Sequence, residues 1–166
     1  MIKKIVALAT GVILFLIGCQ RNPNSDKVEN DNSQKVGMQY KTQMTDIPFV
    51  LVKNYFVKNT LEKLDNPKIE TAEMFNEIFG MATVMGKDGQ PTEIDFKEQY
   101  VIAVILPDTD LETTMAPVSL QKDEKGKLTL TYKTLVGQKQ SYIIRPFFAI
   151  AVDKTENGII ELKEQQ

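Results

Sequence analysis

Apolar residues first gather in a leader at the start of this chain. Two lysines, Lys3 and Lys4, precede an almost uninterrupted apolar run, Ile5–Ile17, which ends at Gly18-Cys19. A charged start, a short apolar middle and a small residue before a cleavage point are typical of a secretory signal peptide. The run is shorter than the roughly 20 residues that a membrane-spanning helix needs. We therefore expect residues 1–18 to be a signal peptide.

Polar residues dominate the next segment, residues 19–45. It is rich in Asn, Gln, Ser, Asp and Lys, it has almost no large aliphatic residue, and its charges alternate in sign. Such a segment cannot bury enough apolar surface to offset the entropy of ordering itself. We predict a flexible tether, followed by one domain at residues 46–166, a length of about 120 residues that suits a single core.

Within that domain, short runs of β-branched and aromatic residues predict strands. The predicted strands are 47–57, 100–106, 117–120, 127–133, 141–152 and 159–162. Segment 100–106 is apolar at every position, which is typical of a central strand that is buried on both faces. Segment 127–133 alternates between apolar and polar residues, which is typical of a half-buried antiparallel strand.

One short helix and several turns complete the pattern. Thr71 is a plausible N-cap, the apolar positions up to Phe79 have helical spacing, and Gly80 ends the helix. Turn-forming residues lie at 123–126, 136–140 and 156–158, and Pro146 interrupts strand 141–152. The expected fold is α+β: a mainly antiparallel β-sheet meander with one short helix packed on a sheet face.

Composition narrows the chemistry that the domain can perform. The chain has no histidine, one cysteine and no glycine-rich phosphate-binding motif. Catalytic groups that need imidazole are therefore excluded, and we expect no metal site and no cofactor. Removing residues 1–18 takes away two lysines and no acid, so the net charge goes from −2 to −4. Without a concentrated basic face, we expect no nucleic-acid partner.

The acidic stretch that follows strand 100–106 is the first candidate site. Alternating acids, as in Asp108, Asp110 and Glu112, can ligate calcium. The EF-hand pattern fails here, because Thr113 stands at the required glycine position and Ser119 at the closing acid position. A solvated loop over 107–117, a weak cation site and a catalytic role remain as alternatives.

Arg145 is the second candidate, because it lies inside an apolar strand and directly before Pro146. A charge in that position must pair or reach solvent. The alternatives are a structural ion pair, a guanidinium that extends off the strand face, and a binding site for an anion or a partner's carboxylate.

The residues Leu16-Ile17-Gly18-Cys19 closely resemble the lipobox of bacterial lipoproteins. The resemblance implies cleavage before Cys19, a diacylglyceryl group on its sulfur and, in many bacteria, a further N-acyl chain. Gln20, in place of the Asp that retains enterobacterial lipoproteins, favours the outer over the inner membrane. The periplasmic or surface side stays open. An ordinary secretory signal and a retained anchor helix are the alternatives. The whole chain is similar to small lipoproteins of unassigned function in Bacteroidetes.

Residues 94–154 resemble the C-terminal domain of PrcB-type protease-complex subunits, which are non-catalytic extracytoplasmic partners of a protease. The resemblance lies in Asp95-Phe96 before a strand, Pro146 and its aromatic pair at the start of a late strand, and Lys154 at its end. That family commonly has a Gly-Gly-Tyr turn where this chain has residues 113–117. The resemblance therefore implies a fold more readily than contact with a protease.

Three functions follow as hypotheses. The first is a lipid-anchored, non-catalytic module that binds a protein or peptide through exposed strand edges or the segment 107–117. The second is a hydrolase that uses carboxylates, for which Asp95, Asp108 and Asp110 form the one cluster to consider. The third is a structural lipoprotein of envelope assembly.

Overall fold

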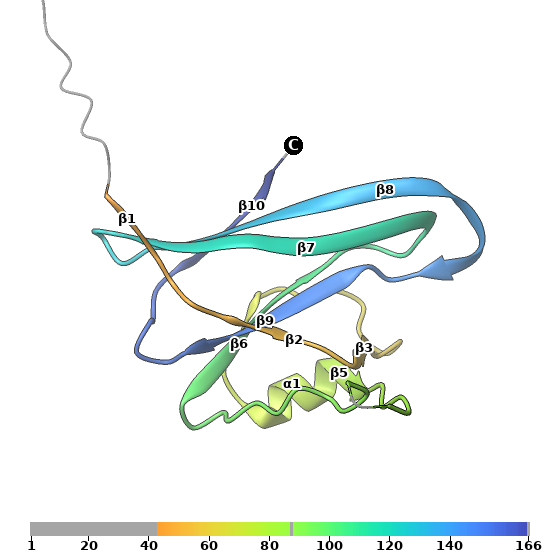
Figure 1. Cartoon of the computed structure of the whole chain (residues 1–166), viewed down its shortest axis with the longest axis horizontal. Helices are drawn as coiled ribbons and strands as arrows, with labels where there is room; N and C mark the ends of the chain where they lie inside the picture. Colours follow the sequence, from red (N-terminus) through yellow and green to blue (C-terminus); the bar gives the residue numbers. More distant parts are fainter. Residues whose placement is uncertain (1–42, 87, 166) are drawn as a thin grey trace, which may run out of the picture. The chain divides into compact units, whose positions relative to one another are not determined.

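The computed structural model describes residues 43–86 and 88–165 (Figure 1). The signal peptide, Cys19, Gln20 and most of the predicted tether lie outside the described residues. Met44 and Thr45, which we expected in the tether, instead belong to the first strand. The elements are β1 (Met44–Asp46), β2 (Val50–Val52), β3 (Tyr55–Val57), β4 (Lys68–Ile69), α1 (Ala72–Ile78), β5 (Phe79–Met81), β6 (Gln99–Ile105), β7 (Thr109–Asp123), β8 (Leu128–Ile144), β9 (Phe147–Asp153) and β10 (Ile160–Gln165).

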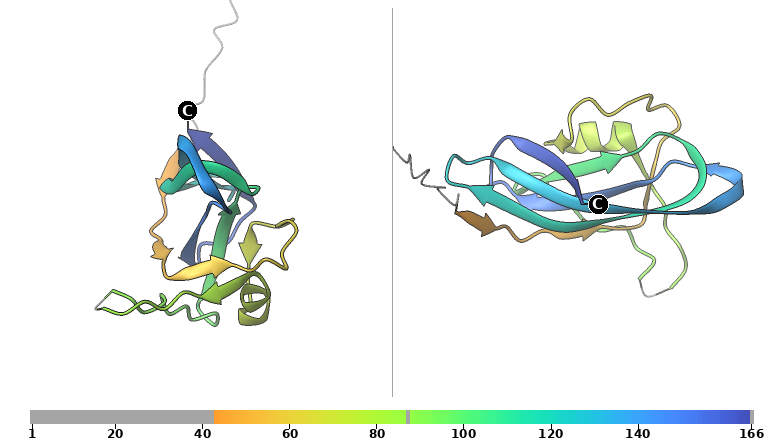
Figure 2. Two further views of the ribbon diagram at one scale, coloured as in Figure 1. Left: turned by 90° about the vertical axis from the view of Figure 1, so that its right-hand side faces the viewer. Right: turned by 90° about the horizontal axis from the view of Figure 1, so that it is seen from above.

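These elements form three layers, which the left view of Figure 2 shows in order. An outer sheet has the strand order β1-β7-β8-β10, and a central sheet has the order β2-β9-β6-β4. The third layer holds α1 and the two-stranded sheet of β3 and β5. One core lies between the outer and central sheets, and a second lies between the central sheet and the third layer. The α+β class, the mainly antiparallel sheets and the single short helix are confirmed among the described residues.

Strand β6 is buried on both faces, as its sequence predicts. Tyr100, Ile102 and Val104 face the core beneath the outer sheet. Val101 and Ala103 face the core beneath α1. Because β6 lies between β9 and β4, both of its edges are paired as well. This strand therefore links the two cores and fixes the central sheet.

Helix α1 begins where the sequence places it. The side-chain oxygen of Thr71 accepts a hydrogen bond from the N–H of Met74 at 3.2 Å, so Thr71 is the N-cap. Phe75 and Ile78 are buried against the central sheet, which confirms that the helix packs on a sheet face. The helix ends at Ile78, slightly before Gly80, because Phe79–Met81 pairs with β3 as a strand.

Prolines and a glycine mark the places where the chain crosses between the two larger sheets. The crossings are at Pro48, Pro107, Pro146 and Gly158. A proline has no N–H to give to a ladder, so it suits a point where pairing changes. The interruption that the sequence places at Arg145-Pro146 is confirmed, because β8 ends at Ile144 and β9 begins at Phe147. The two parts of the expected strand 141–152 nevertheless belong to different sheets. The turn-forming residues 156–158, which we expected to close a hairpin between the last two strands, do not do so, because β10 pairs in parallel with β8.

Strands β7 and β8 are much longer than the sequence suggests. Their hairpin turn at 123–126 is confirmed, with Asp123 N–H bonded to the Lys127 carbonyl. However, the expected loop at 107–117 and the expected turn at 136–140 are both largely strand. These stretches lack a consistent apolar alternation because much of their surface faces solvent, so the usual strand signal is weak there. The predicted strand 47–57 divides into β2 and β3 at Asn54, whose φ is 61°.

Candidate functional site

Arg145 and Asp108 form an ion pair at the base of the long hairpin. Arg145 Nε donates to Asp108 Oδ1 at 2.5 Å, and Nη2 donates to Oδ2 at 3.0 Å. A third donor, Nη1, bonds the carbonyl of Leu61 at 2.6 Å. These hydrogen bonds hold the pKa of Asp108 below its usual value and raise that of Arg145. The pair lines a groove of about 680 Å³ beside residues 61–64. Of the alternatives for Arg145, this geometry matches a structural ion pair.

The other acids of the candidate stretch have separate surroundings. Asp110 pairs with Lys139 at 2.8 Å across the two strands. Glu112 lies beside Gly137 and forms no ion pair within the described part of the chain. No cluster of three potential metal-ligating side chains occurs within residues 43–86 and 88–165. The structure therefore does not bring Asp108, Asp110 and Glu112 together as one site.

The carboxylates proposed for hydrolysis are also apart. Asp95 precedes β6, and Asp108 follows it, so the seven-residue strand separates them by roughly 20 Å of extended chain. One oxygen of Asp95 accepts the N–H of Lys97 at 2.9 Å, which closes a local turn. The two carboxylates of a glycosidase lie within about 10 Å of each other. Asp108 and Asp110 are only two residues apart, but each is paired with its own base, Arg145 and Lys139 respectively, so the three acids form no shared site.

The half of the long hairpin that adjoins Asp108 and Arg145 presents an unpaired strand edge. We call residues 109–117 and 133–144 the arm, which extends past β10 in Figure 1. Strand β10 pairs with β8 only as far as Lys133, opposite Gln165. Beyond that point, β8 has β7 on one side and no described strand on the other. An open edge offers N–H and C=O groups to a further strand.

A large bulge lies near the end of this free edge. Leu111 pairs with Lys139, whereas Thr109 pairs with Ile144, so residues 140–143 have no partner on β7. Such bulges bend a strand and re-aim its side chains. Tyr142 and Ile143, which the bulge carries, are 59% and 71% exposed. The bulge therefore presents two large apolar side chains to solvent.

Further exposed apolar residues lie along the same strand. Leu135 and Val136 are 62% and 61% exposed. A hollow of about 390 Å³ lies where β10 ends, lined by Val118, Lys133, Thr134, Leu135 and Gln165. Sequence reasoning missed this surface because it assigned residues 136–140 to a turn. The available signal was the pair Leu135-Val136, which is unusually apolar for a turn.

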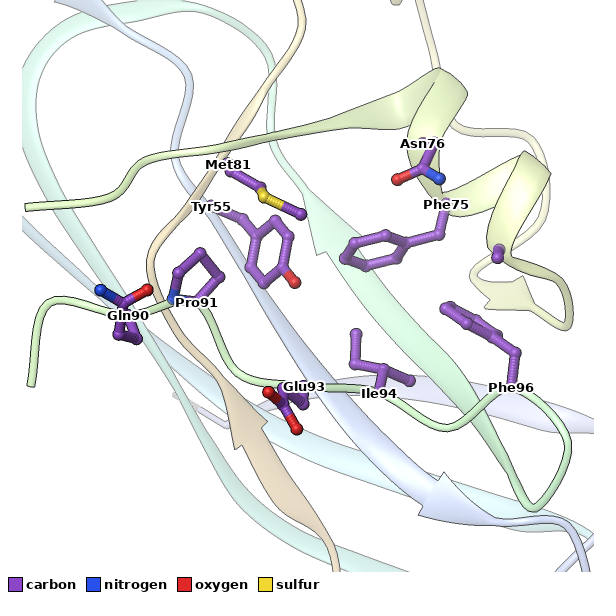
Figure 3. A pocket seen from close by; sticks show the side chains of 10 residues that line it. Tyr55, Phe75, Asn76, Met81, Gln90, Pro91, Glu93, Ile94 and Phe96 are labelled. Atoms are coloured by element: carbon purple, nitrogen blue, oxygen red, sulfur yellow. The ribbon is translucent and has the colours of Figure 1, made fainter.

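A further concave surface lies in the third layer. It is a cleft of about 460 Å³ between α1 and the segment 90–96, shown in Figure 3. None of the residues singled out from the sequence as a candidate site lines it. Its walls come from three separate segments of the chain, Tyr55, residues 72–81 and residues 90–96, so no single local motif marks it.

No protein-family model, curated protein or solved structure matches the chain. The resemblances to PrcB-type subunits and to Bacteroidetes lipoproteins therefore stay predictions. In the part of the chain that the structure describes, no helix has the length and apolar character needed to cross a membrane.

Proposed function

We propose that this chain is a lipid-anchored, non-catalytic binding module at the bacterial outer membrane. It holds an extended segment of a protein partner along the free edge of β8. The anchor rests on the sequence: the lipobox ending at Cys19 and the following Gln20. The observation that carries the binding function is the open edge of β8 beyond Lys133.

Strand addition suits this edge for a physical reason. In this mode of recognition, main-chain hydrogen bonds provide affinity, and alternate side chains provide specificity. Proteins usually protect long free edges by shortening, covering or charging them. The β8 edge does carry a bulge and Lys139, but Leu135 and Val136 remain exposed beside it. An incoming strand would bury these apolar side chains together with its own.

Charge indicates what kind of segment fits. Lys133 and Lys139 are the only charged residues of β8, and Lys139 is already paired with Asp110 of β7, so the edge favours a mainly apolar partner strand over a strongly charged one. A second copy aligned antiparallel about Val136 would set Lys133 opposite Lys139. Like charges directly opposite each other destabilise a strand pair, which disfavours that form of self-association.

Site-specific photocrosslinking in cells tests the proposal. A photoreactive residue at Gln138, on the free edge, is compared with one at Lys163, on β10. We expect a discrete protein adduct from position 138 and none of the same mass from position 163. Mass spectrometry of the adduct should identify the crosslinked partner peptide, and we expect its sequence to be mainly apolar.

A matched pair of variants controls for general surface effects. Leu135→Glu should abolish the adduct from position 138, because it puts a negative charge on the edge. Ile159→Glu changes a residue that is 80% exposed outside the arm and should leave the adduct unchanged. If position 138 gives no discrete adduct while the chain remains in the membrane fraction, the binding function is wrong and a purely structural envelope role replaces it.

A further inference from the structure

The cleft in the third layer has walls that the fold fixes in place. Its lining comes from β3, α1, β5 and the segment 90–96 (Figure 3). Thr92 ties that segment to β2 and β3: its Oγ1 accepts the N–H of Lys53 at 2.9 Å, and its carbonyl accepts the hydroxyl of Tyr55 at 3.0 Å. Asn54 Nδ2 donates to the carbonyl of Gln90 at 2.8 Å. The cleft is therefore largely formed before any ligand arrives.

Aromatic side chains form the apolar part of the cleft. Phe75 is 2% exposed and lies at its base. The ring centroids of Tyr55 and Phe75 are 5.0 Å apart with an interplanar angle of 86°, and those of Phe75 and Phe96 are 5.6 Å apart. Figure 3 shows these rings and Ile94 gathered around one space. A flat or linear apolar group of a ligand fits against such a surface.

The polar part of the cleft carries one charge, and that charge is negative. Glu93 is the only charged residue in the lining, and no basic residue accompanies it. Within the described residues, the Glu93 carboxylate makes no ion pair and no hydrogen bond. Burial, and after it the negative charge of Glu93, raises the pKa of the Tyr55 phenol.

We propose that this cleft binds a small organic amine, with its apolar stem against Tyr55, Phe75 and Phe96 and its ammonium group at Glu93. The carboxylate attracts the cation, and aromatic rings favour a cation near their faces. An organic anion with the same stem would be repelled by Glu93 and would find no basic side chain in the lining. The cleft lies in the third layer, whereas the arm extends from the outer sheet. Amine binding is therefore independent of the proposed strand addition.

Three probes with one stem and different charges test this inference. Phenethylamine, phenethyl alcohol and phenylacetate are titrated into the full chain in detergent micelles, and binding is followed by ligand-observed NMR. We expect phenethylamine to bind about three- to tenfold more tightly than the alcohol and phenylacetate to bind most weakly. Equal affinity for the amine and the alcohol, or no binding of the amine, would overturn the proposal.

Two variants distinguish the effect of the Glu93 carboxylate on amine affinity from the effect of the overall surface charge. Glu93→Gln should remove the preference for the amine while leaving the affinity for the alcohol unchanged. Glu124→Gln, an equal change of charge in the exposed β7–β8 turn, should leave all three affinities unchanged. Because both side chains are exposed, neither variant should prevent folding. An amine preference that survives in Glu93→Gln would show that another group binds the cation.

Discussion

Arg145 and Asp108 join two of the crossings between the outer and central sheets. Asp108 lies between β6 and β7, Arg145 lies between β8 and β9, and two hydrogen bonds of 2.5 and 3.0 Å connect them. Such a bidentate interaction between a planar guanidinium and a carboxylate fixes the relative orientation of the two groups and also attracts them to each other. Because Arg145 also bonds the Leu61 carbonyl, the pair fixes the base of the arm against the neighbouring loop.

Acid should weaken the fold partly through this pair. Arg145 lowers the pKa of Asp108 below its usual value, so the pair stabilises the folded state above the unfolded carboxyl's pKa. That contribution is lost as the pH falls through the lower, folded pKa. Urea unfolding between pH 6 and about pH 2 should show a shallower loss of stability in Asp108→Asn than in the wild type. In a chain that already carries Arg145→Met, adding Asp108→Asn should not change the dependence of the unfolding free energy on pH. If Asp108→Asn has its full effect there, Arg145 is not the cause of the lowered pKa of Asp108.

Alkali should weaken the fold through Tyr100. Its hydroxyl donates to the carbonyl of Glu156 at 2.8 Å, and burial, followed by the charges of Glu156 and Glu70, raises its pKa to about 12. The unfolded phenol ionises near pH 10. The raised pKa of Tyr100 therefore contributes fully to the free energy of unfolding below about pH 10. This contribution, on the order of 2–3 kcal/mol, is lost as the pH rises through the pKa of the folded state.

Replacement of Tyr100 provides the measurement. Tyr100→Phe should cost about 1 kcal/mol at neutral pH, because the Glu156 carbonyl loses its donor. In urea unfolding, Tyr100→Phe should also lose less stability than the wild type between pH 10 and pH 12, because the ionisation of Tyr100 no longer contributes. Tyr142→Phe, at a residue that is 59% exposed, is the matched control and should follow the wild-type profile. Parallel profiles for Tyr100→Phe and the wild type would refute the prediction.

Gly158 should tolerate no side chain. A Cβ there would lie 2.0 Å from the carbonyl oxygen of Gly126, which belongs to the backbone of the β7–β8 turn. Gly158→Ala should therefore destabilise the protein by about 2–4 kcal/mol in chemical unfolding. At Gly137 the closest atom to a Cβ is the side-chain oxygen Oε2 of Glu112, at 2.8 Å, and that side chain can move. Gly137→Ala should cost less than about 1 kcal/mol, and similar losses for the two variants would contradict this packing.

Membrane attachment should depend on Cys19. If two acyl chains are joined to its sulfur, each buried methylene contributes about 0.8 kcal/mol, and the anchor holds without a spanning helix. In detergent phase partition, we expect the wild type in the detergent phase and a leader-cleaved Cys19→Ser chain in the aqueous phase. Mass spectrometry that finds a free thiol in the mature wild-type polypeptide would exclude the lipid anchor.

Local signals predicted the parts of the fold that local physics determines. The continuous apolar run of β6, the N-cap at Thr71 and the turn at 123–126 each appear where their residues indicate. The arm was missed because its strands face solvent over much of their length, so no apolar alternation marks them. Likewise, no local sequence pattern predicts that β10 pairs in parallel with β8 instead of forming an antiparallel hairpin with β9.

The sites show the same division between local and distant contacts. The sequence identified Arg145 and Asp108 as unusual, but not as partners, because 37 residues separate them. The free edge of β8 depends on where β10 ends, and the third-layer cleft depends on Tyr55, Phe75 and Glu93 from three separate segments. Such features arise from tertiary packing, which a single sequence does not reveal.

Amide hydrogen exchange across β8 tests strand addition most directly. It is measured on the full chain alone and on the complex trapped by the photoreactive residue at position 138. If the partner adds a strand, amides within residues 134–139 should exchange at least about tenfold more slowly in the complex. Amides of residues 128–133, which already lie between β7 and β10, should not change. Unaltered exchange over 134–139 in the complex would contradict binding at this edge.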